Sequence, residues 1–180
     1  MRVIGGLAKG TRLAPVPAGT RPVSDRAREG LFSSLGDHVE GARVLDLFAG
    51  TGALGIEALS RGAARALFVD SAPAAVRTIV ENLRRTRLEA LAEVRRLDAR
   101  GFLRQRSGSF DLVLADPPYR FEPRLLERVL AELGEGGMVG PGSRVVLTRS
   151  SKSYSPVIPI DWLAERRLCY GDAVLIVFAI

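Results

Sequence analysis

The sequence has few residues of the kinds that hold metals or form disulfides. Its 180 residues include one cysteine, Cys169, and one histidine, His38. A single cysteine excludes an intrachain disulfide, and one cysteine with one histidine cannot make a usual zinc site. We therefore expect a protein without a metal.

Long apolar runs and a secretory leader are also missing. No run approaches the roughly 18 apolar residues that a membrane span needs. The first ten residues, MRVIGGLAKG, are too polar and too rich in glycine for a signal peptide. We expect a cytoplasmic protein that has no membrane partner and is a monomer.

Lysine is scarce, and the basic charge is unevenly distributed. Only Lys9 and Lys152 are lysines among 26 basic residues, and the net charge is +6. Residues 1–28 hold six basic residues against one acid, Asp25. Such a segment is either a solubilising tail or a surface that meets a phosphate backbone. Its glycines and prolines favour an ordered arm. We expect a basic β arm or hairpin over residues 1–22 and one domain over residues 23–180.

The rest of the chain alternates short apolar runs with helical patterns. Ser24 or Asp25 is a suitable N-cap for a first helix, which would bury Ala27, Leu31, Phe32 and Leu35. Nearly continuous apolar strands between helices predict an α/β fold with a parallel sheet covered on both faces. A terminal hairpin turning at Gly171 and Asp172 completes the pattern. The expected strands are 42–48, 65–70, 92–98, 110–116, 143–150 and the two arms of this hairpin.

A glycine-rich stretch, LDLFAGTGALGIEAL, follows the first of these strands. Gly50, Gly52 and Gly55 have the spacing G-x-G-x-x-G, which is typical of nucleotide-binding loops and fits NAD as well as other ligands. Asp46, four positions before Gly50, would repel a pyrophosphate and attract a cation. S-adenosylmethionine (SAM) has no phosphate, and it carries a sulfonium and an ammonium group. The loop therefore favours SAM over the NAD of an oxidoreductase.

Two more acids end the next two strands. Asp70 stands where a carboxylate can accept both ribose hydroxyls, and Asp98 where one can accept from the adenine amino group. Each aspartate alone could simply cap the following helix or turn. Three acids at three successive strand ends beside a glycine loop favour a cofactor site. We expect this site to include Phe48 and Ala99 as well.

The stretch LADPPYRF ends the fourth strand with Asp116, Pro117, Pro118 and Tyr119. An exocyclic amine of a nucleobase is a poor nucleophile because its lone pair is delocalised into the ring. A carboxylate oxygen of Asp116 and the carbonyl of Pro117 could accept its two hydrogens, while Tyr119 stacks on the base. These four residues are the expected catalytic group, although a turn with an exposed tyrosine is the simpler interpretation.

Together these motifs resemble the bacterial 16S rRNA guanine-N2 methyltransferases. The resemblance rests on RVIGG, GTRPVSDRAREGLFSSL, LDLFAGTGALGIEALSRGA, DPPY and YGDAVL, and it covers almost the whole chain. It implies a seven-stranded Rossmann-like sheet of the class I SAM-dependent methyltransferases, with an antiparallel last strand. It also implies SAM as cofactor, S-adenosylhomocysteine as product, and guanine 966 of the small ribosomal subunit as target. The residues that it implies for RNA or substrate binding are Arg12, Arg21, Arg26, Arg28 and Tyr119.

The chain departs from that family pattern at four positions, and other functions stay open. Thr20, Val23, Gly30 and Thr148 replace residues that are usual there, and Gly30 is unfavourable inside a helix by about 1 kcal/mol relative to alanine. A D-P-P-Y motif also serves N6-adenine DNA methyltransferases and methyltransferases that act on protein glutamine. A non-enzymatic alternative is an RNA-binding factor for ribosome assembly.

Overall fold

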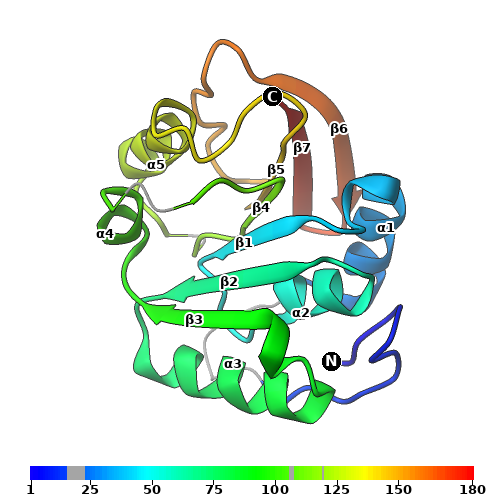
Figure 1. Cartoon of the computed structure of the whole chain (residues 1–180). Helices are drawn as coiled ribbons and strands as arrows, with labels where there is room; N and C mark the ends of the chain where they lie inside the picture. The colour runs from blue at the N-terminus through cyan, green and yellow to red at the C-terminus, as the bar shows by residue number, and fades with distance from the viewer. Residues whose placement is uncertain (16–22, 106–107, 119) are drawn as a thin grey trace.

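A computed structural model describes residues 1–15, 23–105, 108–118 and 120–180, and its seven strands form one sheet (Figure 1). The strand order is β3-β2-β1-β4-β5-β7-β6. Neighbours from β3 to β5 are parallel, whereas β7 is antiparallel to both β5 and β6. The predicted α/β fold, with its antiparallel last strand, is confirmed. The strands are β1 Arg43–Leu47, β2 Arg65–Asp70, β3 Ala92–Arg96, β4 Leu112–Ala115, β5 Arg144–Ser150, β6 Leu163–Tyr170 and β7 Ala173–Ala179.

Five helices cover the two faces of this sheet. Helices α1, α2 and α3 share a hydrophobic core with one face, and α4 and α5 share a second core with the other. Central strands are therefore buried on both sides, which explains why β4 has four consecutive buried apolar residues. The helices are α1 Asp25–Leu35, α2 Ala53–Ser60, α3 Pro73–Thr86, α4 Ala99–Leu103 and α5 Pro123–Glu135, with short 3-10 turns at Gly36–His38 and Glu89–Leu91.

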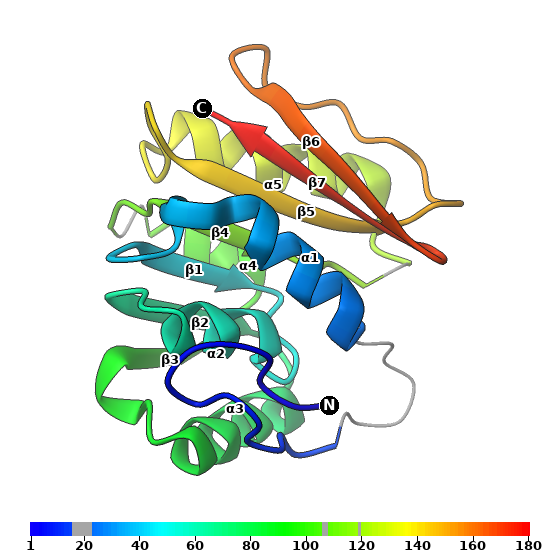
Figure 2. The same cartoon turned by 90° about the vertical axis from the view of Figure 1, so that its right-hand side faces the viewer.

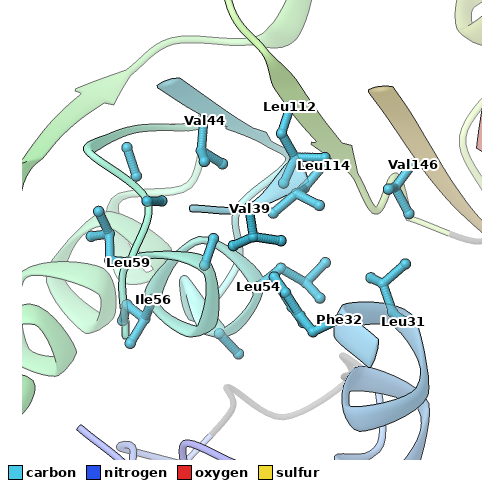
Figure 3. Close-up of a cluster of buried hydrophobic side chains, with 14 of the residues drawn as sticks. Leu31, Phe32, Val39, Val44, Leu54, Ile56, Leu59, Leu112, Leu114 and Val146 are labelled. Carbon is cyan, nitrogen blue, oxygen red and sulfur yellow. The ribbon is translucent and has the colours of Figure 1, made fainter. Parts of the chain in front are cut away.

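The core beneath α1 and α2 positions the glycine loop. Figure 3 shows side chains of these two helices packed against the strands: Phe32 of α1 and Leu54 of α2 lie near Leu114 of β4 in one buried cluster. All three are at most 5% exposed. Burying a side chain of this size contributes roughly 1.5–3 kcal/mol. The start of α2, and with it the loop that leads into the helix, is thereby fixed to the sheet.

Helix α1 begins as its sequence predicts. Ser24 caps it by accepting from the N–H of Ala27, and the expected apolar face is buried. The unfavourable Gly30 has a packing reason, because a Cβ atom at this position would collide with the hydroxyl of Tyr170 on β6. Glycine is thus the residue that lets α1 lie against the terminal hairpin.

The N-terminal segment, defined here as residues 1–15, crosses the face of α2 (Figure 2). The expected hairpin is reduced to one antiparallel bridge between Arg2 and Arg12. Backbone hydrogen bonds flank this bridge, from the N–H of Val3 to the Thr11 carbonyl and from the N–H of Leu13 to the Met1 carbonyl. The segment also bonds to α2, where the N–H groups of Ile4 and Gly5 donate to the Glu57 carboxylate. The Ala8 N–H likewise donates to Ser60 Oγ. No helix among the described residues is long and apolar enough to cross a membrane.

Candidate active site

A cavity of about 760 Å³ lies at the carboxyl ends of the parallel strands. This is the edge at which open α/β sheets bind ligands. The loops that follow β1, β2, β3 and β4 contribute its walls, together with the beginning of α1. The predicted site residues that line it are Arg28, Asp46, Phe48, Gly50, Asp70, Asp98, Ala99, Asp116, Pro117 and Pro118.

The glycine loop has the backbone conformation for which it needs glycine. Gly50 has φ = 58° and Gly52 has φ = 76°, and both angles lie in the left-handed region. Gly50 lines the cavity, whereas Gly52 is absent from its lining and begins α2. Gly55 is needed for packing, because a Cβ there would collide with the ring of Phe68. The three glycines therefore shape the loop, and Gly50 forms its ligand-facing part.

Asp70 holds this loop from the neighbouring strand. Its Oδ2 accepts from the N–H of Gly50 at 2.8 Å, and its Oδ1 accepts from the N–H of Ala72 at 2.9 Å. Each carboxylate oxygen has a second lone pair. Asp70 is thus able to fix the glycine loop and still accept from a ribose hydroxyl.

Asp98 and Ala99 lie at the far end of the cavity. Asp98 is exposed and caps α4, since its Oδ1 accepts from the N–H of Gly101 at 2.8 Å. The capping role considered from the sequence is therefore present, in a residue that also faces the cavity. Leu97 and Ala99 add apolar surface beside it. Such a surface suits a flat aromatic ring better than a phosphate.

The inner wall of the cavity carries two carboxylates, Asp46 and Asp116, whose pKa values are raised. Burial raises the pKa of Asp46 to about 8, and the negative charges of Asp116 and Asp70 add to this, while the N–H of Gly55 counteracts it. Burial also raises the pKa of Asp116 to about 7. Bringing these acids together makes ionisation unfavourable until a positive charge arrives. The cavity is therefore suited to a cationic ligand.

Asp116 and Pro117 present two hydrogen-bond acceptors at this wall. Within the described residues, neither the Asp116 carboxylate nor the Pro117 carbonyl accepts a hydrogen bond, whereas the Pro118 carbonyl accepts from the N–H of Phe121 at 2.8 Å. Phe121 in turn meets Phe48 edge to face, with ring centroids 5.0 Å apart. Pro118 and Phe121 are thus held in place, and among the described residues the two acceptors of Asp116 and Pro117 have no donor. Tyr119 lies outside the described residues.

Phe48 also has a strained backbone. Its φ of 66° is in the left-handed region, which a bulky side chain rarely adopts. Strain of this kind costs about 1–3 kcal/mol and persists where the surroundings enforce it. Here it turns the chain from β1 into the glycine loop and places the Phe48 ring against the cavity.

The arginines expected to contact RNA differ in their positions. Arg12 and Arg26 are exposed, and neither lines the cavity. Arg28 is fully buried and lines the cavity, so it lies at the pocket rather than on the outer surface, and its role towards the substrate stays a prediction. It donates to Asp25 and to the carbonyl of Arg2. Arg21 lies outside the described residues.

Two polar residues near the site were missed by sequence reasoning. Glu57 of α2 is fully buried, with Arg28 Nη1 at 3.5 Å and Arg61 Nε at 2.8 Å from its carboxylate. Asn82 of α3 is also fully buried and reaches the glycine loop. Both interrupt otherwise apolar helix faces, and that interruption was the available signal.

Comparisons with known proteins agree with this geometry. The family model described as conserved hypothetical protein 95 matches residues 1–179. The ribosomal RNA small subunit methyltransferase D of Escherichia coli K12 is 36% identical over 96% of this chain and 86% of its own, and that of Haemophilus influenzae is 32% identical over 90% and 84%. A solved structure of E. coli yhhF has a TM-score of 0.88 at 35% identity and covers 99% of this chain and 97% of that one.

A hypothetical protein of Thermus thermophilus has a TM-score of 0.83 at 34% identity, covering 100% of this chain and 99% of its own. The sheet order, the glycine loop and these likenesses identify the fold as that of the class I SAM-dependent methyltransferases. The resemblance found in the sequence is confirmed: the chain belongs to the conserved hypothetical protein 95 family, the family of the ribosomal RNA small subunit methyltransferase D proteins.

Proposed function

We propose that the chain transfers a methyl group from SAM to the exocyclic N2 amine of a guanine in 16S rRNA, with guanine 966 of the small ribosomal subunit as the target. The observation that carries methyl transfer to an amine is the pair of acceptors, Asp116 and Pro117, which accept no hydrogen bond among the described residues and lie on the wall of a cavity that also contains the glycine loop. The choice of guanine rests on the resemblance of the N-terminal motifs to the family. The names of the relatives support ribosomal RNA as the substrate.

The cavity fits the cofactor in both size and chemistry. Its volume of about 760 Å³ is within the usual range for small-molecule sites. Asp70 faces the cavity where ribose hydroxyls would be held, and Leu97 and Ala99 form an apolar wall for adenine. The first turn of α2 can receive the methionine carboxylate. The acidic inner wall complements the sulfonium and ammonium groups.

When bound, SAM supplies an electrophilic methyl group. The chain has to present a nitrogen lone pair in line with it. A carboxylate oxygen of Asp116 and the carbonyl of Pro117 would accept hydrogen bonds from the two N–H groups of the guanine amine and draw its nitrogen towards a tetrahedral shape. As the N–CH3 bond forms and the bond between sulfur and methyl breaks, the nitrogen would release one proton, which the ionised Asp116 carboxylate is placed to accept. The fixed loop after β4 limits misalignment, to which an in-line transfer is sensitive. The target guanine must be unpaired or flipped to enter, and Tyr119 would stack on it.

The product of the reaction tests this assignment. The protein is incubated with methyl-labelled SAM and small-subunit RNA or particles, and the RNA is digested to nucleosides. We expect the label in N2-methylguanosine, with guanine 966 confirmed by mapping of the RNA fragment. Label in N6-methyladenosine would overturn the substrate while sparing the chemistry. SAM binding without any transfer to RNA or particles would favour an assembly factor.

The acidity of the wall predicts a pH dependence of SAM affinity. Asp46 and Asp116, with pKa values of about 8 and about 7, hold protons at pH 6 in the free protein. These raised values stabilise the free protein at low pH, and that contribution is lost as the pH rises through 7–8. A cationic ligand favours the ionised carboxylates, so it must displace protons at low pH. We expect affinity to rise roughly tenfold or more from pH 6 to pH 8.

Calorimetry in buffers of different ionisation enthalpy measures this effect directly, because released protons are taken up by the buffer. We expect proton release at pH 6.5 and less of it in the Asp46→Asn variant. An affinity that is flat across this range, with no proton release, would contradict the electrostatic account of the wall.

A further inference from the structure

Asn82 is a buried amide in the middle of an apolar helix face. It lies on α3 with Ile79 and Leu83, which are 0% and 3% exposed, and it is itself 0% exposed. An unsatisfied amide there would be costly, because buried polar groups need hydrogen-bond partners. The partners of Asn82 therefore indicate why it is present.

Both ends of this amide bond to distant parts of the chain. Its Nδ2 donates to the Thr51 carbonyl at 2.9 Å, across 31 residues. Its Oδ1 accepts from the Ala14 N–H at 2.6 Å, across 68 residues. The orientation of the amide follows from its partners, since a carbonyl can only accept and an N–H can only donate. Asn82 thus joins the glycine loop to the N-terminal segment.

Thr51 is the residue between the two left-handed glycines of that loop. Gly50 is held by Asp70, and the N–H of Gly52 donates to the Ala49 carbonyl at 2.7 Å. The Thr51 carbonyl is held by Asn82 from the far side of the loop. These three hydrogen bonds, with that from the Ala49 N–H to the Val69 carbonyl at 3.1 Å, hold the loop, and one of the four depends on a side chain that also binds residue 14.

We propose that Asn82 is a positioning residue which makes the shape of the cofactor loop, and hence SAM affinity, depend on the seating of the N-terminal segment. This rests on the proposed function for the identity of the ligand. Asn82 does not line the cavity, so its effect on SAM passes through Thr51, which does. The position of the N-terminal segment, fixed at Ala14, would then affect the conformation of the cofactor loop through the Asn82 side chain.

Three variants separate the two ends of the link. Asn82→Leu removes both hydrogen bonds at similar side-chain size. Asn82→Asp keeps an acceptor for Ala14 but loses the donor to Thr51. Ala14→Pro removes only the N–H that Asn82 accepts from. Thr86→Val is the matched control, because Thr86 is a buried polar residue on α3 whose hydroxyl bonds to carbonyls of its own helix.

The first measurement is amide hydrogen exchange of residues 50–54 in the ligand-free protein. We expect faster exchange in all three variants than in Thr86→Val. The second is SAM binding and steady-state kinetics, where we expect Kd and KM for SAM to rise roughly tenfold while kcat at saturating SAM stays within about twofold. The double variant Asn82→Leu with Ala14→Pro should be no worse than Asn82→Leu alone.

Loop exchange equal to that of Thr86→Val in either Asn82→Leu or Ala14→Pro would overturn the proposal, as would additive effects in the double variant. A wild-type protein that does not bind SAM would instead overturn the cofactor assignment. The exchange measurement needs no ligand. It therefore tests whether Asn82 couples Ala14 to Thr51 even if the protein does not bind SAM.

Discussion

Replacing Asp116 by alanine is expected to lower the rate of methyl transfer by roughly a hundredfold or more. The variant loses the carboxylate that would accept from the target amine, while the Pro117 carbonyl remains. Asp116 lies at the end of β4, on the opposite side of the cavity lining from Asp98 and Ala99, which would hold the base of the cofactor. Single-turnover kinetics at saturating SAM measure the effect.

SAM affinity is the control for this variant and should change by less than the rate. Loss of the Asp116 charge removes one contribution to the raised pKa of Asp46, so Asp46 should ionise at lower pH. Asp116→Asn makes the test sharper, because an amide of the same size retains one acceptor and presents N–H groups to the amine. Near-normal turnover in Asp116→Ala would show that Asp116 does not act on the acceptor, whereas the rate of Asp116→Asn measures how much of the effect needs the carboxylate charge.

Replacing Glu57 by alanine is expected to lower the free energy of unfolding by about 3–5 kcal/mol, since removal of one partner leaves a buried charge uncompensated. The carboxylate is fully buried and accepts from the N–H groups of Ile4 and Gly5 as well as from Arg61. Arg28, also fully buried, would lose the buried one of its two acids, at 3.5 Å, and keep Asp25 at 2.6 Å. For a chain of this length the melting temperature should fall by roughly 6–20 °C.

Glu81→Ala is a matched comparison for Glu57→Ala. Both glutamates pair with an arginine four residues later in a helix, but the side chains of Glu81 and Arg85 are 47% and 43% exposed. An exposed pair contributes at most about 1 kcal/mol. Thermal and urea unfolding of the two variants should therefore differ clearly. Equal losses would mean that burial of Glu57 adds nothing to its pairing.

The architecture was predictable because its signals are local. A strand buried on both faces is apolar throughout, and a glycine loop has its own spacing, so the sheet and the beginning of α2 follow from short stretches of sequence. The same reasoning placed Asp46, Asp70, Asp98 and Asp116 at strand ends, and the structure gathers all four around one cavity. The carboxyl ends of parallel strands lie at one edge of the sheet, so the four aspartates could be expected to lie close together once the strands were known to be parallel neighbours.

The contacts of the buried polar side chains were not predictable, because their hydrogen-bond partners are distant in the sequence. Glu57 sits in an apolar helix, where its sequence does not show that the N–H groups of Ile4 and Gly5, more than 50 residues away, donate to it. Arg28 resembled one more basic residue of a charged helix until Glu57 and Asp25 were found beside it. The N-terminal segment pairs with itself as a small antiparallel turn, but its hydrogen bonds to Glu57, Ser60 and Asn82 could not be read from the sequence for the same reason.

The seating of residues 1–15 has a consequence for the order of folding. These residues are synthesised before their side-chain partners Glu57, Ser60 and Asn82, which lie 52–68 residues further along the chain. Closing loops of that size costs entropy that only later contacts repay. Residues 1–15 therefore cannot form these long-range hydrogen bonds until α2 and α3 have been synthesised and packed.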